Sequence, residues 1–83
     1  MKFKVDVDIM PLDELLDPQG KVVNRGLANL GLNGIDNVRI GKHINFNIEA
    51  GNEQEAEKLV DEACKKLLAN LIMEKYSYTI SAA

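Results

Sequence analysis

Cysteine and histidine are almost absent from this chain, which holds one of each, Cys64 and His43. One cysteine cannot form an internal disulfide, and a single histidine beside it cannot complete a zinc site. A chain this short buries only about 60% of its unfolded surface, so it is marginally stable without such aids. We therefore expect one domain, residues 1–83, that gains stability by associating with other copies or other chains.

Long apolar runs and an excess of positive charge are also missing. No stretch approaches the roughly 18 apolar residues of a membrane span, and the alternating N-terminus is unlike a secretory signal. The lone thiol fits a reducing compartment, so the expected location is the cytoplasm. A formal net charge of −3 disfavours a protein that grips nucleic acid by its phosphates. We expect neither a membrane nor a nucleic acid as partner.

Alternation of charged and apolar residues is the clearest feature of the N-terminus. In residues 2–9, KFKVDVDI, every second side chain is apolar, which predicts a half-buried strand. Two further alternating runs, 38–40 and 44–48, lie on either side of Gly41. A glycine between two such runs favours a hairpin.

A first helix is expected between the first strand and this hairpin. Asp17 can accept hydrogen bonds from the amides of the first turn, and Pro18 suits the first helical position. Gly31 can take the left-handed conformation that ends a helix. An apolar stripe at helical spacing should be buried on the sheet, and a glycine within it favours close packing there. The stripe comprises Val23, Gly26, Leu27 and Leu30.

The second helix has the strongest signal in the chain. Asn52 caps its start, and Glu55 three residues later forms a variant of the capping box. Asn70 can take the left-handed conformation that ends it. Residues 71–73 either fill the bottom of the core or meet a second copy, and alternation over 76–80 predicts a final strand. The apolar stripe of this helix comprises Ala56, Leu59, Val60, Ala63, Cys64, Leu67, Leu68 and Leu71.

The predicted order of elements is β-α-β-β-α-β. With right-handed crossovers, this order gives a four-stranded antiparallel sheet with two helices on one face. The fold class is therefore α+β, a ferredoxin-like sandwich. The other face of the sheet should be polar, carrying Lys4, Asp6, Asn45, Asn47 and Thr79.

No group of residues forms a self-sufficient catalytic, cofactor or metal site. His43 has no partner at a useful spacing, and Cys64 falls within the helical stripe as a small buried residue does. Phe3 and Phe46 lie on the apolar side of their strands, so the open face lacks the stacking platform of an RNA reader. Two function classes remain: an interaction subunit, and a homodimeric regulatory module that binds a small ligand.

Four motifs, in order and at the family's spacing, resemble the small-subunit (PurS) family of phosphoribosylformylglycinamidine synthase. They are Asp17-Pro18-Gln19-Gly20, Leu30-Gly31, Arg39-Ile40-Gly41-Lys42 and Leu67-Leu68-Ala69-Asn70, with Glu74 and Tyr76 after the last. The resemblance covers essentially the whole chain. The family commonly places a proline after the position of Asn70, and because Leu71 stands here the second helix can run on for a few residues.

The resemblance implies a non-catalytic assembly subunit in de novo purine biosynthesis. In this family a glutaminase subunit releases ammonia, and a large ATP-dependent synthetase subunit uses it to convert formylglycinamide ribonucleotide into the amidine. The small subunit associates with itself and joins the other two. ATP and magnesium are then expected on the synthetase subunit, and no cofactor on this chain. A dimer and a tetramer both remain open.

The candidates for partner contacts are Asp17, Gln19, Gly20, Arg39, Lys42 and Asn70. Asp17 and Pro18 are enough to start the helix, so capping does not explain Gln19 and Gly20. A glycine in the first turn even lowers helix stability. We hypothesise that this turn meets a partner subunit; the alternative is that Gly20 relieves a crowded contact inside the domain. Arg39 and Lys42 either face an acidic partner surface or form ordinary solvated charges.

Overall fold

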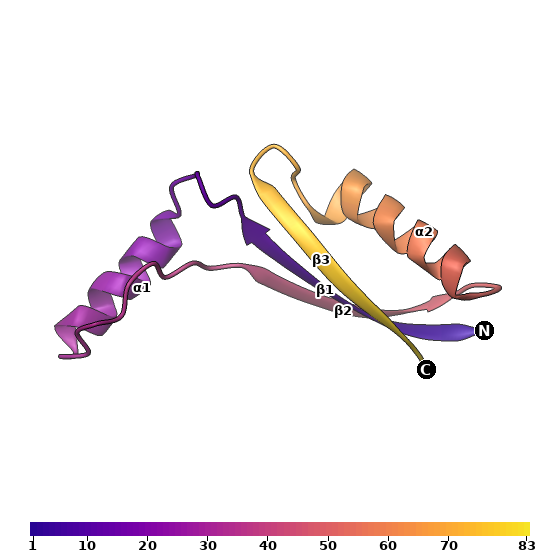
Figure 1. Ribbon diagram of the computed structural model, residues 1–83, viewed down its shortest axis with the longest axis horizontal. Coiled ribbons are helices and arrows are strands. Elements are labelled where there is room, and N and C mark those ends of the chain that lie inside the picture. The colour runs from indigo at the N-terminus through magenta and orange to yellow at the C-terminus, as the bar shows by residue number, and fades with distance from the viewer.

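The molecule consists of two parts that stand apart from each other (Figure 1). The computed structural model describes residues 1–83. We call the sheet and its covering helix the body, residues 1–11 and 42–83. A link, residues 12–17, leads to the arm, residues 18–41, which holds the other helix and the segment that returns from it. The radius of gyration is 16.4 Å, against about 12 Å for a globular chain of this length.

Three antiparallel strands form the sheet, in the order β2-β1-β3. They are β1 (Lys2–Pro11), β2 (Lys42–Glu49) and β3 (Glu74–Ala82). On the central strand, Val5 lies opposite Phe46 of β2 and Ile80 of β3. This register places the apolar side chains of all three strands on one face.

The predicted strands over 2–9, 44–48 and 76–80 are confirmed, and each extends slightly further than its pattern. The opposite face of the sheet is polar, as predicted. On that face the Nδ1 of His43 donates to the carboxylate of Asp8 at 2.7 Å, and its other ring nitrogen lies 3.5 Å from Asp6. The bond to Asp8, and then the charges of both carboxylates, raise the pKa of His43.

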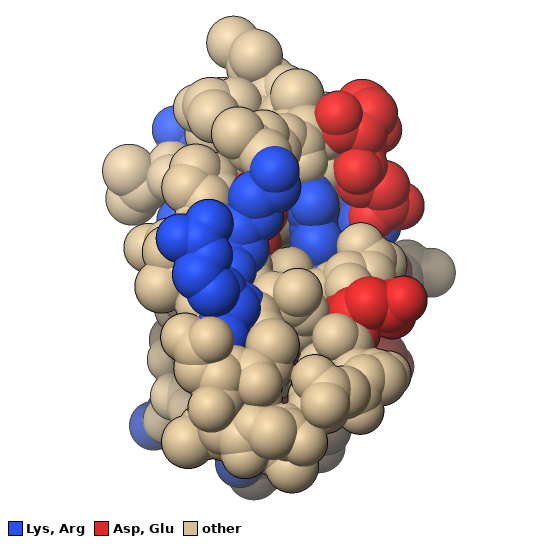
Figure 2. Space-filling view, turned by 90° about the vertical axis from the view of Figure 1, so that its left-hand side faces the viewer, with Lys and Arg blue, Asp and Glu red and all other residues tan.

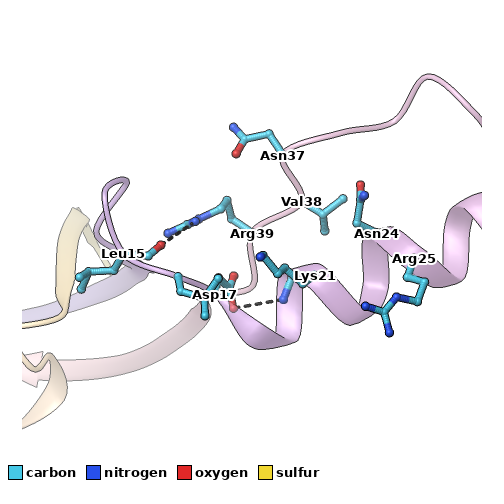
Figure 3. Close-up of a pocket in the computed structure, with 10 residues that line it drawn as sticks. Leu15, Asp17, Lys21, Asn24, Arg25, Asn37, Val38 and Arg39 are labelled. Atoms are coloured by element: carbon cyan, nitrogen blue, oxygen red, sulfur yellow. Dashed lines mark hydrogen bonds between the residues drawn. The ribbon is translucent and has the colours of Figure 1, made fainter.

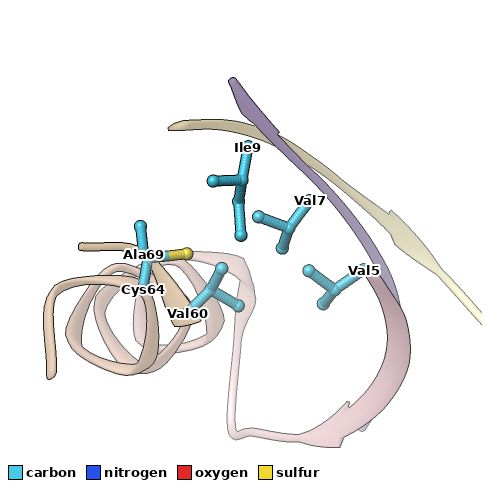
Figure 4. Close-up of a cluster of buried hydrophobic side chains, with 6 residues drawn as sticks. All are labelled: Val5, Val7, Ile9, Val60, Cys64 and Ala69. Carbon is cyan, nitrogen blue, oxygen red and sulfur yellow. The ribbon is translucent and has the colours of Figure 1, made fainter. Parts of the chain in front are cut away.

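One helix, α2 (Glu53–Ala63), covers the apolar face of the sheet (Figure 4). Its predicted cap is confirmed. The amide of Glu55 donates to the side chain of Asn52 at 2.8 Å, and the carboxylate of Glu55 accepts from the amide of Gly51 at 3.2 Å. Residues of β1, of α2 and of the stretch after it form the main core, which comprises Val5, Val7, Ile9, Val60, Cys64 and Ala69.

The second helix ends in a π-helical turn, η1 (Cys64–Leu68), instead of reaching Asn70. The amide of Ala69 donates to the carbonyl of Cys64, five residues back, at 3.0 Å, and this widens the last turn. The wider turn brings Ala69 into the core and leaves Leu67 83% exposed. The predicted stripe is therefore only partly buried: Leu59 is 37% exposed, and Leu67 turns outward because the helical period changes there.

The predicted end of this helix is wrong in two respects. Asn70 is not left-handed, since Asn37 is the one non-glycine residue with a positive φ. The helix also does not run on past Asn70, because the backbone is already extended at Ala69. Residues 71–73 form an exposed turn before β3, so they do not fill the core.

The predicted four-stranded sheet is wrong, because the structure has three strands. The segment 38–40, expected as the fourth, leads into β2 from outside the sheet and pairs with no strand (Figure 1). It does not fold back at Gly41 because its hydrogen bonds go to the link: Arg39 and Ile40 both bond to link residues. The three strands that do form keep the order expected for a ferredoxin-like α+β fold without its edge strand.

The first helix, α1 (Pro18–Asn29), begins at Asp17 as predicted but does not cover the sheet. The arrangement of two helices on one face is therefore wrong, and only α2 lies there (Figure 1). Within the predicted buried stripe, Leu30 is 76% exposed. An added Cβ at Gly26 would meet nothing within 4 Å, so the close packing expected there is also wrong. No helix combines the length and apolar character that a membrane span requires.

Candidate functional site

The arm meets the body at a junction formed by the link, the first turn of α1 and the segment that enters β2 (Figure 3). Two grooves open at this junction, and both include Asp17 in their walls. Together they bring all six predicted contact residues into one region: Asp17, Gln19, Gly20, Arg39, Lys42 and Asn70.

Asp17 lies at the centre of the junction and is only 8% exposed. One carboxylate oxygen accepts from the amide of Gly20 at 3.1 Å, and the other accepts from the amide of Ile40 at 2.7 Å. The bond from Ile40, followed by that from Gly20, holds the pKa of this carboxyl below its ordinary value, because both bonds favour the charged form. Asp17 therefore caps the helix and also holds the segment that returns from it.

Arg39 ties the returning segment to the link. Its guanidinium donates to the carbonyl of Leu12 at 2.7 Å and to the carbonyl of Leu15 at 3.1 Å. The Nε atom is buried and has no partner. Much of the hydrogen-bonding capacity of Arg39 is thus used inside the chain, and its predicted contact with an acidic partner surface stays a prediction.

Gly20 and Gln19 have different surroundings. An added Cβ at Gly20 would lie 2.1 Å from the carbonyl oxygen of Val38, so no side chain fits there. This crowded contact inside the chain accounts for the glycine without a partner, and the partner contact at Gly20 stays a hypothesis. Gln19 is exposed, and its side chain forms no hydrogen bond within the chain. Its amide group is available to another molecule.

The first groove, which we call the arm groove, lies between α1 and the returning segment and measures about 570 Å³. Its polar lining is mostly cationic or amide in character (Figure 3). These polar residues are Lys21, Asn24, Arg25, Asn37 and Arg39, together with Asp17. Such a lining favours an anionic or hydrogen-bonding partner.

The second groove, the junction groove, measures about 470 Å³ and lies between the link, the first turn of α1 and the turn before β3. Lys42 and Glu74 form an ion pair at 3.4 Å within its lining, and Glu74 also accepts from the amide of Asn70 at 2.8 Å. Leu16 and Met73 line it as well and are 66% and 54% exposed. A mixed surface of this kind, with apolar side chains beside satisfied polar groups, suits contact with another protein.

Sequence reasoning did not select the other residues that line the grooves. Lys21, Asn24 and Arg25 have i, i+3, i+4 spacing, which places them on one face of α1. No acidic residue occurs between positions 18 and 35. These two signals were present in the sequence and would have identified the arm as a basic surface.

Reactive side chains elsewhere serve packing and hydrogen bonding. Cys64 lies in the core, as predicted, and burial raises the pKa of its thiol. The hydroxyl of Tyr76 donates to Asp61, and this bond raises the pKa of Tyr76 to about 12. The bond ties β3 to α2. No group of three or more His, Cys, Asp and Glu side chains is placed to hold a metal ion.

Known proteins match the chain over both the body and the arm. The PurS subunit of phosphoribosylformylglycinamidine synthase from Synechocystis is 44% identical over 68 residues, which cover 82% of this chain and 68% of the relative. The PurS structure from Bacillus subtilis has a TM-score of 0.86 at 38% identity, covering 95% of this chain and 98% of that one. A chain in the structure of PurLQS from Thermotoga maritima has a TM-score of 0.89 at 30% identity, covering 98% and 99%.

A family model described as PurS, phosphoribosylformylglycinamidine (FGAM) synthase, matches residues 4–82. Except for the first two residues of β1, that range includes the strands of the body, and it includes the projecting helix and all six junction residues. Since the sequence match and the structural match extend over the same two parts, the separation of arm and body is shared with these relatives. The chain belongs to the PurS family of phosphoribosylformylglycinamidine synthase.

Proposed function

We propose that this chain is the non-catalytic assembly subunit of phosphoribosylformylglycinamidine synthase in de novo purine biosynthesis. It joins the glutaminase subunit to the ATP-dependent synthetase subunit, in the cytoplasm. ATP and magnesium bind to the synthetase subunit, and no cofactor binds to this chain. Membership of the PurS family and the likeness to a chain of PurLQS support this proposal.

The observation that carries the proposal is the uncovered arm. A helix with an apolar stripe gains most of its stability when another surface covers that stripe. In this chain the arm and the link before it expose large apolar side chains that no other element of the chain covers. They are Leu16, Val22, Val23, Leu30, Leu32 and Ile35. Other chains supply the missing cover.

A second copy of the chain is one source of that cover. Self-association to a dimer or a tetramer would bury apolar surface of the arm, and the unpaired edges of β2 and β3 offer a further route. Light scattering coupled to size exclusion separates the two assemblies. A monomer at micromolar concentration would contradict self-association.

Assembly has a chemical purpose in an enzyme that transfers ammonia. Ammonia released into water near neutral pH is protonated, and ammonium is not a nucleophile. A complex that excludes bulk water between the two active sites keeps the reactive form. The small subunit contributes by holding the larger subunits together.

Kinetics test this role directly. We expect that omitting this chain abolishes glutamine-dependent turnover by the two larger subunits and leaves turnover with added ammonium salts largely intact. Equal loss of both activities would contradict the proposal, because it would mean that the chain shapes the synthetase active site. A thermal shift with free amino acids, without co-elution with the larger subunits, would instead favour a homodimeric ligand-binding module.

The exposed Gln19 gives a sharper test of the junction. Gln19→Ala should leave the melting temperature nearly unchanged and weaken binding to the larger subunits, because its amide makes no bond within the chain. Gln54→Ala, at an exposed position of α2, is the matched control. If both variants bind as tightly as the original chain, Gln19 is not a contact residue.

A further inference from the structure

Charge is unevenly distributed between the arm and the rest of the chain. The chain has a formal net charge of −3, yet residues 18–41 hold three cationic side chains and one acidic one, Asp36. Figure 2 views the molecule from the end where the arm lies, and Lys and Arg side chains gather near the middle of that face. The arm is therefore a basic surface on an acidic protein.

Cations are paired with carboxylates in the body more often than in the arm. Four of the seven lysines of the body form ion pairs with carboxylates, whereas none of the three cations of the arm does; the four are Lys42, Lys65, Lys66 and Lys75. On the arm, Lys21 and Arg25 form neither an ion pair nor a side-chain hydrogen bond, and Arg39 donates only to backbone carbonyls. The positive charge of the arm is thus left for a partner to neutralise.

The cationic side chains of the arm line the arm groove. Lys21, Asn24 and Arg25 of α1 all line the arm groove, and the returning segment forms its facing wall (Figure 3). Asn24 extends toward Asn37 and Val38, and its Oδ1 atom is buried without a hydrogen-bond partner. The groove therefore holds buried polar atoms without hydrogen-bond partners, on Asn24 and Arg39, and cations that form no ion pair.

The facing wall also has unused backbone donors. Among residues 33–41, the amide of Ile40 is the one that finds an acceptor within the chain, on Asp17. Backbone amides without an internal acceptor can bond to the main chain of another polypeptide. The arm groove thus combines main-chain donors on one wall with cationic side chains on the other.

These features fit the carboxylates of a protein better than a phosphate. A phosphate site at a helix start uses free amides, but here Asp17 accepts from the amide of Gly20 and puts a negative charge at that position. Both terminal nitrogens of Arg39 are already bonded to carbonyls. Lys21 and Arg25 remain available beside backbone amides that have no acceptor within the chain. Such a surface suits an extended acidic segment.

We propose that the arm groove binds an acidic segment of a larger subunit of the complex. This inference rests on the proposed function and adds the chemistry of the partner surface. The segment places its carboxylates on Lys21 and Arg25 and its backbone along residues 37–39. Binding is then electrostatic in part, and it weakens as salt is added.

A charge-reversal pair tests the groove in the assembled complex. The variant Lys21→Glu with Arg25→Glu should bind the larger subunits about tenfold more weakly at low ionic strength, and with a smaller dependence on salt. The control, Lys4→Glu with Lys58→Glu, makes the same change in net charge at two unpaired lysines of the body. It should alter binding less than about twofold. Circular dichroism checks that both variants fold.

The outcomes separate this inference from the assembly role. If the original chain binds the larger subunits and the arm variant binds as tightly, the groove proposal is overturned and the assembly role stands. If the original chain does not bind them, the assembly role fails. A hexaglutamate peptide then tests the groove alone and should bind the original chain more tightly than the arm variant. Tighter binding of tripolyphosphate than of hexaglutamate would overturn the proposal in favour of a phosphate site.

Discussion

The body and the arm are both built from amphipathic sequences, but only the body buries an apolar core of its own. Val7 of β1 and Val60 of α2 are fully buried, whereas Val22 and Leu30 of the arm are 68% and 76% exposed. α2 lies back over the sheet, and α1 is held away from it by the bonds of the junction. The difference teaches that an apolar stripe predicts a face to be covered but does not say which molecule covers it.

The largest expected effect comes from placing an aspartate in the core of the body, compared with the same substitution on the arm. Val7→Asp should destabilise the chain by about 4 kcal/mol or more, enough to unfold it, because the carboxylate would be buried without a partner. Val23→Asp should leave the chain folded and weaken its self-association, because that side chain is already 40% exposed. Circular dichroism and light scattering measure the two effects.

Equal unfolding by both aspartates would break the comparison. It would show that the stripe of the arm is as necessary to the fold of the single chain as the core of the body. A folded Val7→Asp variant would also contradict the comparison, because it would show that the core of the body tolerates a buried charge.

Two glycines of α1 sharpen the comparison within the arm. Gly20→Ala should destabilise the junction by roughly 2 kcal/mol, because its Cβ would overlap the carbonyl of Val38. Gly26→Ala should stabilise the helix by about 1 kcal/mol, because alanine has the higher helix propensity and the position is open. Hydrogen exchange of the α1 amides should therefore become faster in the first variant and slower in the second.

The Gly20→Ala variant also distinguishes the two explanations for Gly20. If Gly20→Ala leaves amide exchange in α1 unchanged but abolishes binding to the larger subunits, the partner contact explains the glycine. Slower exchange than in the original chain would show that the returning segment moves aside without cost.

The smallest expected effect is a dependence on pH at the junction. The pKa of Asp17 is lowered in the folded chain, so its stabilising contribution is present above the ordinary value of 3.8 and is lost as the pH falls below it. Amide protection in α1 should decline severalfold over that range. Asp17→Asn should reduce the protection already at pH 6 and remove most of this pH dependence.

Two comparisons control this measurement. Asp36→Asn, at an exposed carboxylate of the arm, should preserve the acid dependence. His43 behaves oppositely, since its pKa is raised: its contribution is complete below 6.5 and is lost as the pH rises through the raised value. A rise in pH therefore tests the contribution of His43, and acid below pH 3.8 tests that of Asp17. Unaltered protection of α1 in acid would contradict the capping role.

Much of the junction could be predicted from the sequence, because its parts are local. Asp17 and Pro18 signal a helix start within a few residues, and that signal is correct. The six contact candidates lie in one region, and their contact with a partner stays a prediction. The bonds from Ile40 to Asp17 and from Arg39 to the link could not be predicted, because they join residues more than 20 positions apart.

The sequence by itself determined the strands, the helix starts and the polar open face. These follow from side-chain period and from capping, which act between near neighbours along the chain. Only the tertiary structure decided that segment 38–40 leaves the sheet, that η1 turns Leu67 outward, and that α1 projects from the body. Each of these features depends on which distant groups satisfy one another's hydrogen bonds. A periodic sequence pattern cannot decide them, because it is the same whether the apolar face meets its own sheet or another chain.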